Sequence, residues 1–149
     1  SMKPEYLYHG SAKELEGDKL LPKQATDLGE RPENLHCALY ATERKEIAIT
    51  MAILSCKGVI CSGLNFDTKG KCGIIYEGWP EQKHIYLYTL SNETFQQDEK
   101  LSQWYSLEPV KPLKTEKWNV IDHLSLVRKA TDEERTIFFN KYKHKIPRN

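Results

Sequence analysis

The chain has 149 residues, of which 39% are hydrophobic and 29% are charged, a composition typical of a folded globular protein rather than of a disordered or fibrous one. Its 22 lysines and arginines almost balance its 21 aspartates and glutamates, leaving a net charge of +1, which argues against a nucleic-acid binder that relies on a broad basic field. The length predicts one domain with its own core, over residues 2–149. We expect Ser1, which precedes a methionine, to be the remnant of an expression tag.

Neither a membrane span nor a secretion signal is visible in the sequence. No apolar run approaches the ~18 residues of a membrane-spanning helix, and the first thirty residues are too polar for a signal peptide. We therefore expect a cytoplasmic protein with no membrane partner. The cysteines follow no common zinc-binding spacing, so we expect reduced, structural thiols and no bound metal; they are Cys37, Cys56, Cys61 and Cys72.

In the first half of the chain, two strands and one clear helix are predicted. Aromatic and β-branched residues predict strands over Glu5–Tyr8 and Leu39–Ala41, and a weaker pattern predicts a turn of helix over Ala12–Leu15. Thr42 is the expected N-cap of a helix over residues 43–56, where apolar residues recur near helical spacing.

The second half contains further short strands and a C-terminal helix. Strands are predicted over Gly73–Tyr76, His84–Leu90 and Trp118–His123. A capping-box pattern that begins at Thr131 opens a helix over residues 131–143. Many short strands with few helices predict an α+β fold and not a doubly wound parallel sheet.

The standard catalytic signatures are absent, but one local feature points to a ligand site. The first strand ends in Tyr8-His9-Gly10-Ser11, which places an imidazole at a sheet edge. The glycine lets a ligand approach the backbone, whose N–H and C=O can pair with a carboxamide such as nicotinamide. Tyr40, in the second strand, can offer a flat face to an aromatic ring. The alternatives are a structural histidine and a core tyrosine.

Six short segments, in a fixed order along the chain, carry a resemblance to a known family. Three lie in the N-terminal part: Tyr8-His9-Gly10-Ser11, Gly17-Asp18-Lys19-Leu20-Leu21-Pro22 and Leu39-Tyr40-Ala41-Thr42. Three lie further on: Ile85-Tyr86-Leu87, Phe95-Gln96-Gln97-Asp98 and Tyr105-Ser106-Leu107-Glu108-Pro109-Val110. Together they resemble the rifamycin ADP-ribosyltransferases, small single-domain relatives of the diphtheria-toxin and poly(ADP-ribose) polymerase fold. The similarity covers most of positions 6–124, and residues 56–83 are longer than the family's connection, as a family-variable insertion would be.

The resemblance implies split antiparallel β-sheets with a few short helices, and NAD as a co-substrate. On this basis His9, Gly10 and Ser11 would bind NAD, with the glycine backbone holding the nicotinamide. Tyr40 would stack against the nicotinamide ring. The implied reaction breaks the glycosidic bond of NAD through an oxocarbenium-like ribose, releases nicotinamide and passes ADP-ribose to an acceptor.

The acidic member of the implied catalytic set is Asp98, which would act together with the histidine and the tyrosine. Gln97 stands where the family has an acidic residue, so Glu99 and Glu93 remain open as alternatives. The resemblance favours a small-molecule hydroxyl as acceptor, while the longer connection leaves a protein or a nucleic-acid end open. Trp104 and Tyr105 follow the acidic segment closely enough to line an acceptor site.

Three other interpretations of the sequence remain. A non-catalytic module that binds NAD or ADP-ribose would keep the fold without the reaction. An NAD-dependent RNA 2′-phosphotransferase resembles the same broad fold, but it needs several arginines around a phosphate pocket. The arginines do not cluster near the histidine motif: they are Arg31, Arg44, Arg128, Arg135 and Arg148. In the third interpretation, His9 and Tyr40 are only structural residues.

Overall fold

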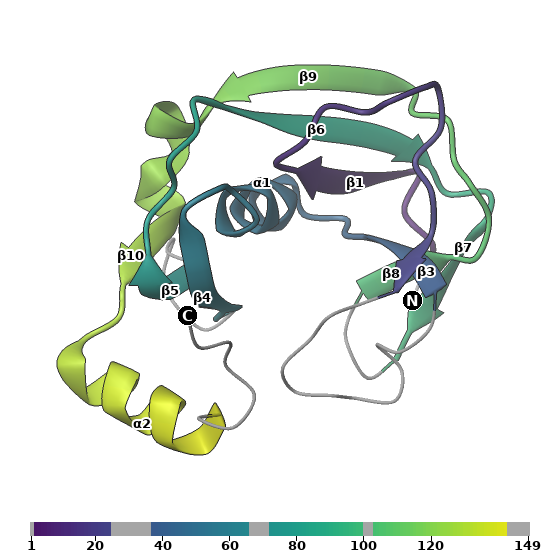
Figure 1. Cartoon of the computed structure of the whole chain (residues 1–149). Coiled ribbons are helices and arrows are strands. Elements are labelled where there is room, and N and C mark those ends of the chain that lie inside the picture. The colour runs from purple at the N-terminus through teal and green to yellow at the C-terminus, as the bar shows by residue number, and fades with distance from the viewer. Residues whose placement is uncertain (1, 25–36, 66–71, 100–102, 143–149) are drawn as a thin grey trace.

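The computed structural model describes residues 2–24, 37–65, 72–99 and 103–142 (Figure 1). The strands of the described chain are β1 (Tyr6–Ser11), β2 (Lys23–Gln24), β3 (Cys37–Ala41), β4 (Val59–Leu64), β5 (Gly73–Gly78), β6 (His84–Ser91), β7 (Phe95–Asp98), β8 (Gln103–Ser106), β9 (Lys114–Asn119) and β10 (Val127–Lys129). The helices are α1 (Lys45–Leu54), the 3-10 helix η2 (Val120–Leu126) and α2 (Asp132–Tyr142). The predicted α+β class is therefore confirmed.

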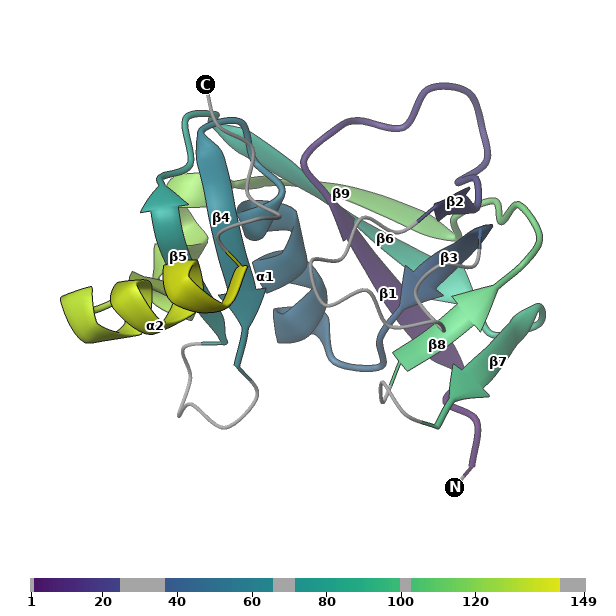
Figure 2. The ribbon, with the colours of Figure 1, turned by 60° about the horizontal axis from the view of Figure 1, so that its bottom comes forward.

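The described strands form three sheets, two of which pack against α1. The first has the order β1-β6-β9 and is antiparallel. The second has the order β10-β5-β4, with β10 parallel to β5, and the third has the order β2-β3-β8-β7 and is antiparallel. Figure 1 shows α1 between the first sheet and the β4–β5 pair, and in Figure 2 the β3-β8-β7 group lies at the opposite end of the molecule from α2.

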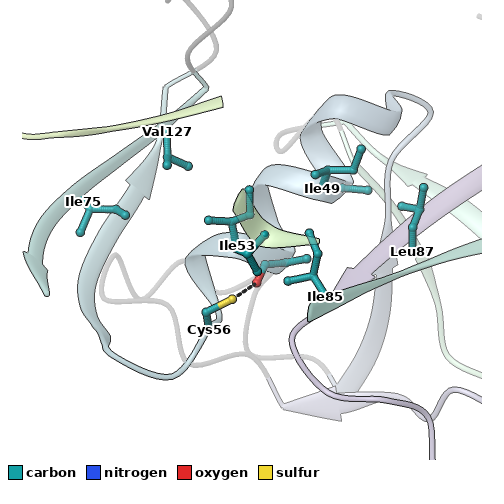
Figure 3. Close-up of a cluster of buried hydrophobic side chains, with 10 residues drawn as sticks. Ile49, Ile53, Cys56, Ile75, Ile85, Leu87 and Val127 are labelled. Atoms are coloured by element: carbon teal, nitrogen blue, oxygen red, sulfur yellow. Dashed lines mark hydrogen bonds between the residues drawn. The ribbon is translucent and has the colours of Figure 1, made fainter. Parts of the chain in front are cut away.

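The first hydrophobic core surrounds α1. This helix buries six of its ten residues, because a helix that is apolar on most of its circumference needs protein on more than one side. In Figure 3, β6 contributes Ile85 and Leu87 from one side, while β5 and β10 contribute Ile75 and Val127 from the other. The one buried hydroxyl of the helix, on Thr50, donates to the Glu46 carbonyl at 2.6 Å and so carries no desolvation penalty.

The second hydrophobic core lies on the opposite face of β1 and β6, against β3, β7 and β8. Side chains alternate between the two faces of a strand, so β1 and β6 contribute residues to both cores. The members of the second core are Leu7, Leu20, Leu39, Ala41, Tyr88, Leu90, Phe95, Trp104 and Val110. The first sheet is therefore covered on both faces.

Four of the five predicted strands are confirmed, but the one predicted over Trp118–His123 is mostly wrong. The strand β9 ends at Asn119, and the chain turns into η2 at Val120. The Val120 N–H still bonds to the Lys83 carbonyl at 2.8 Å, in register with the His84–Asn119 pair, and the chain leaves the ladder only after this bond. Ile121 is 77% exposed and lies in η2. It gives the sequence the alternating pattern of a strand, although it belongs to none.

Of the two predicted helix starts, the first is wrong and the second is right. Thr42 is not the N-cap of α1, because its backbone pairs with Tyr8 and keeps it extended; the helix begins at Lys45 after Arg44. The capping box before α2 is confirmed: the Thr131 hydroxyl accepts from the Glu134 N–H at 3.1 Å, and the Glu134 carboxylate accepts from the Thr131 N–H at 2.9 Å. Residue 143 of that prediction lies outside the described residues.

Two further segments differ from the sequence expectation. Residues 12–15 form no helix, since their backbone bonds to side chains from distant segments. Within residues 56–83, the structure contains β4 and β5, which cover one side of α1. The strand β4 has no clean period-two pattern, and its register against β5 shifts around Cys61, so its sequence does not indicate a strand.

Candidate functional site

The strands β1 and β3 touch at one point and then separate. Tyr8 and Thr42 exchange two backbone hydrogen bonds, of 2.7 Å and 2.9 Å, in an isolated bridge that does not extend into a ladder. Beyond the bridge, the His9 side chain spans the gap, with its Nδ1 atom 2.8 Å from the Tyr40 carbonyl oxygen. We call this region, between Gly10 of β1 and Tyr40 of β3, the β1–β3 split. Two residues that the sequence selected are therefore joined directly.

The bond to Tyr40 determines the chemical state of His9. A carbonyl oxygen only accepts, so Nδ1 carries the hydrogen and Nε2 of the neutral ring is a hydrogen-bond acceptor. Burial lowers the pKa of His9, and the positive charge of Lys23 lowers it further, although the bond to the Tyr40 carbonyl acts in the opposite direction. His9 is thus a neutral imidazole at neutral pH, with Nε2 able to accept from a hydroxyl.

Gly10 directs its backbone polar groups into the split. In an antiparallel strand, the N–H and C=O groups of residues two apart point to the same side. Those of Tyr8 point to β3, so those of Gly10 point there too and away from β6. A Cβ atom on Gly10 would overlap the Ala48 carbonyl of α1. The glycine therefore has a packing role that the sequence did not reveal.

Tyr40 is half-buried and does not belong to either core. Its neighbours Leu39 and Ala41 point into the second core, so the Tyr40 side chain lies on the other face of the β2-β3-β8-β7 sheet. Tyr105 is its register partner on that face, with ring centroids 6.5 Å apart. The Tyr105 hydroxyl donates to Oε1 of Gln96 at 3.2 Å. The core-tyrosine interpretation of Tyr40 is wrong.

Asp98 shares this face but stands apart from the split. It is half-buried at the end of β7 and pairs in register with Gln103 of β8. Because Phe95 points into the second core, the period-two alternation places Asp98 on the same face as Tyr40. Its strand is separated from β3 by β8, a distance of about 10 Å between strand axes.

The other acidic candidates lie in turns. Glu93 is exposed in the turn before β7, at the opposite end of that strand from Asp98. Glu99 is exposed in the turn after β7. Of the three, only Asp98 lies in a strand on the face that carries Tyr40.

The predicted site residue Ser11 accepts, through its hydroxyl, from the Lys13 N–H at 3.1 Å. Two neighbours of His9, Lys23 and Tyr88, were not predicted as site residues from the sequence. Lys23 lies near enough to affect His9, and the Tyr88 ring centroid is 6.4 Å from that of His9. No local pattern could reveal these contacts, because they join different strands. Trp104, expected to line an acceptor site, is instead 6% exposed in the second core, since it faces away from its neighbour Tyr105.

The arginines of the described residues are engaged in ion pairs. Arg44 pairs with Glu46 at 2.7 Å, Arg135 pairs with Glu77 at 3.0 Å, and Arg128 pairs with Glu134 at 2.7 Å. The last pair is bidentate, and hydrogen bonding from the guanidinium lowers the pKa of Glu134 to about 2. Arg31 and Arg148 lie outside the described residues.

The described cysteines form neither a disulfide nor a metal site. The four cysteines are free thiols, three of them buried, and burial raises the pKa of Cys56 to about 11. Within the described ranges, no group of three or more histidine, cysteine, aspartate or glutamate side chains is arranged to hold a metal ion. No described helix combines the length and apolar character needed to cross a membrane. Comparisons with protein-family models, curated proteins and solved structures gave no match.

Proposed function

We propose that this protein is an NAD-dependent ADP-ribosyltransferase, which releases nicotinamide and passes ADP-ribose to an acceptor. The observation that carries the proposal is the 2.8 Å bond from His9 Nδ1 to the Tyr40 carbonyl, in a split into which Gly10 directs its backbone groups. Tyr40 lies 31 residues from His9 in sequence, and the bond joins these two residues that the family resemblance selected as NAD ligands.

Each residue of the split has a role that its geometry supports. The Gly10 N–H and C=O pair with the carboxamide of nicotinamide, which offers one acceptor and one donor in the matching order. The Tyr40 ring stacks on the nicotinamide ring. His9, held neutral by burial, uses Nε2 to accept from a ribose hydroxyl.

Asp98 is the carboxylate we assign to the reacting ribose. The bond between the ribose carbon and the nicotinamide nitrogen breaks, and its electron pair leaves with nicotinamide. A carboxylate stabilises the positive ribose that results. The acceptor hydroxyl oxygen then bonds to the same carbon, and its proton passes to Asp98 or to solvent.

Among the described residues, the arginine positions disfavour the RNA 2′-phosphotransferase. That reaction needs guanidinium groups free to bind phosphate, and Arg44, Arg128 and Arg135 are paired with carboxylates. Arg128 and Arg135 pair around α2, at the opposite end of the molecule from β3, β8 and β7 (Figure 2). The binding module that lacks turnover is distinguished by experiment.

The deciding experiment follows nicotinamide release from NAD by proton NMR. The parent protein and the Asp98→Ala variant are compared, with Glu99→Ala as the matched control. We expect release by the parent and by Glu99→Ala, and none by Asp98→Ala. NAD-induced shifts without release, in the presence of a panel of hydroxyl acceptors, would identify a binding module. Absence of both shifts and release would refute the proposal.

A further inference from the structure

Tyr88 connects the candidate histidine to the backbone that follows it. It is the register partner of His9 on β6, and its side chain is 0% exposed. The two ring centroids are 6.4 Å apart at an interplanar angle of 32°. At the other end of the ring, the Tyr88 hydroxyl accepts from the Leu15 N–H at 2.8 Å and donates to the Lys13 carbonyl at 3.4 Å. One side chain thus contacts the imidazole and holds residues 13–15.

The hydroxyl of Tyr88 is not needed to fill the core. A phenylalanine would bury the same ring, and a buried hydroxyl costs free energy unless it is hydrogen-bonded. Here the hydroxyl satisfies the Leu15 N–H, a group 73 residues away in sequence. The tyrosine therefore serves to fix the backbone of this segment.

The segment over residues 12–20 lies on the face of β1 and β6 from which the imidazole projects. It begins directly after Ser11, and its residues Leu15 and Leu20 pack in the second core together with Tyr88. Leu20 and Val110 exchange backbone hydrogen bonds of 2.8 Å and 2.9 Å, which fix the far end of the segment.

The near end of the segment is held by a second distant side chain. Gln82 Nε2 donates to the carbonyls of Ala12 and His84, at 2.8 Å each. Gln82 Oε1 accepts from the Lys57 N–H at 2.9 Å. With both ends anchored, the bond to Tyr88 fixes the middle of the segment.

We propose that Tyr88 is a positioning residue of the NAD site: its hydroxyl holds residues 13–15 beside His9, so that this segment forms a wall against which bound NAD lies. The inference rests on the proposed function. The wall adjoins His9 and the sugar that His9 contacts, whereas nicotinamide alone is bound by Gly10 and Tyr40. Loss of the hydroxyl therefore weakens the binding of NAD but not of nicotinamide.

The test compares Tyr88→Phe with Tyr86→Phe, the matched control on the same strand and the same face. The dissociation constants of NAD and of free nicotinamide are measured by NMR titration of both variants and of the parent. For Tyr88→Phe we expect an NAD constant about tenfold higher, the effect of losing one buried hydrogen bond, and an unchanged nicotinamide constant. The Tyr86→Phe variant should match the parent for both ligands.

Other outcomes separate the two proposals. Equal weakening of both ligands would mean general damage to the fold, and no weakening of either would mean that the segment is not part of the site; each result overturns the role of Tyr88. A parent that binds neither ligand would overturn the proposed function itself. If Tyr88→Phe does not fold, hydrogen exchange of the parent decides: NAD should slow exchange of the Leu15 amide, and an unchanged rate would contradict the proposal.

Discussion

At the scale of single residues, the state of His9 follows from one acceptor and from burial. The Tyr40 carbonyl fixes the hydrogen on Nδ1, and desolvation lowers the pKa of the ring. Between that lowered value and 6.5, the value of a free histidine, the unfolded chain holds a proton at this position that the folded chain does not. The contribution of His9 to the free energy of unfolding is therefore complete above about pH 6.5 and is lost as the pH falls toward the lowered pKa.

The pH dependence can be tested with His9→Asn. The asparagine Nδ2 can replace Nδ1 as donor to the Tyr40 carbonyl but does not titrate. We expect the free energy of unfolding of the parent to fall more than that of the variant between about pH 7.5 and about pH 5.5. Urea unfolding at both pH values measures the difference. Parallel losses in the two proteins would show that the pKa of His9 is the same in the folded and unfolded chains.

The same variant separates the two nitrogens of His9 in function. It retains the bond that joins β1 to β3 and removes the Nε2 acceptor. We expect NAD binding to weaken by roughly 1 kcal/mol, the net value of a hydrogen bond, as measured by isothermal titration calorimetry. His9→Ala, which loses both nitrogens, should also lower the melting temperature. Unchanged NAD affinity in His9→Asn would remove Nε2 from the site.

Tyr40 should bind through its ring rather than its hydroxyl. Replacing it with alanine removes the stacking surface, and we expect NAD binding to weaken by ~1–3 kcal/mol, by analogy with contacts between nucleic-acid bases and aromatic side chains. Tyr40→Phe keeps the ring and should bind NAD like the parent. Titration calorimetry on both variants checks this. If Tyr40→Phe bound NAD as weakly as Tyr40→Ala, the hydroxyl and not the ring would make the contact.

At the scale of elements, the close contact between β1 and α1 depends on Gly10. A Cβ atom at Gly10 meets the Ala48 carbonyl, which belongs to the helix backbone and cannot rotate away. Strand and helix must then separate, and both carry residues of the first core. The missing side chain at Gly10 thus lets α1 approach the sheet.

Gly10→Ala should therefore destabilise the protein by about 1–3 kcal/mol or more, as overpacking does in cores. Gly63→Ala is the control, because a Cβ there would meet only the Tyr76 ring at 3.7 Å, an ordinary contact, and should change little. Thermal unfolding of both variants measures the effect. Equal melting temperatures would show that α1 shifts at no cost.

At the scale of the whole molecule, α1 and α2 differ in how they are attached to the rest of the protein. The helix α1 lies between sheets and buries six residues, whereas α2 has no buried residue. It is held by its capping box, by the Arg128–Glu134 pair and by the stacking of Phe138 on Tyr76, with ring centroids 4.0 Å apart.

This difference predicts a gradient of local stability. We expect the amides of α2 to exchange with solvent at least ~100-fold faster than those of α1, because α2 can open without exposing a core. Hydrogen exchange followed by NMR gives both rates in one experiment. Similar protection of the two helices would mean that α2 unfolds only with the rest of the chain.

How much the sequence could predict depends on the range of the interactions involved. His9, Gly10 and Tyr40 stand at strand ends with recognisable local patterns, and the capping box of α2 is entirely local. The bond between His9 and Tyr40 spans 31 residues, and the bridge that keeps Thr42 extended is tertiary, so neither has a local signal. The burial of Trp104 depends on which face of β8 meets the second core. The His9–Tyr40 bond, the extended backbone of Thr42 and the burial of Trp104 all depend on how the sheets meet in the folded chain.

The bridge between Tyr8 and Thr42 is a single backbone pair, and the next link between β1 and β3 is an imidazole. A backbone ladder would bring the two strands to the regular spacing of a sheet, whereas here a side chain joins them. The spacing of β1 and β3 beyond the bridge thus depends on the reach from the His9 backbone to its Nδ1 atom. A donor held further from the backbone at position 9 would place the two strands further apart.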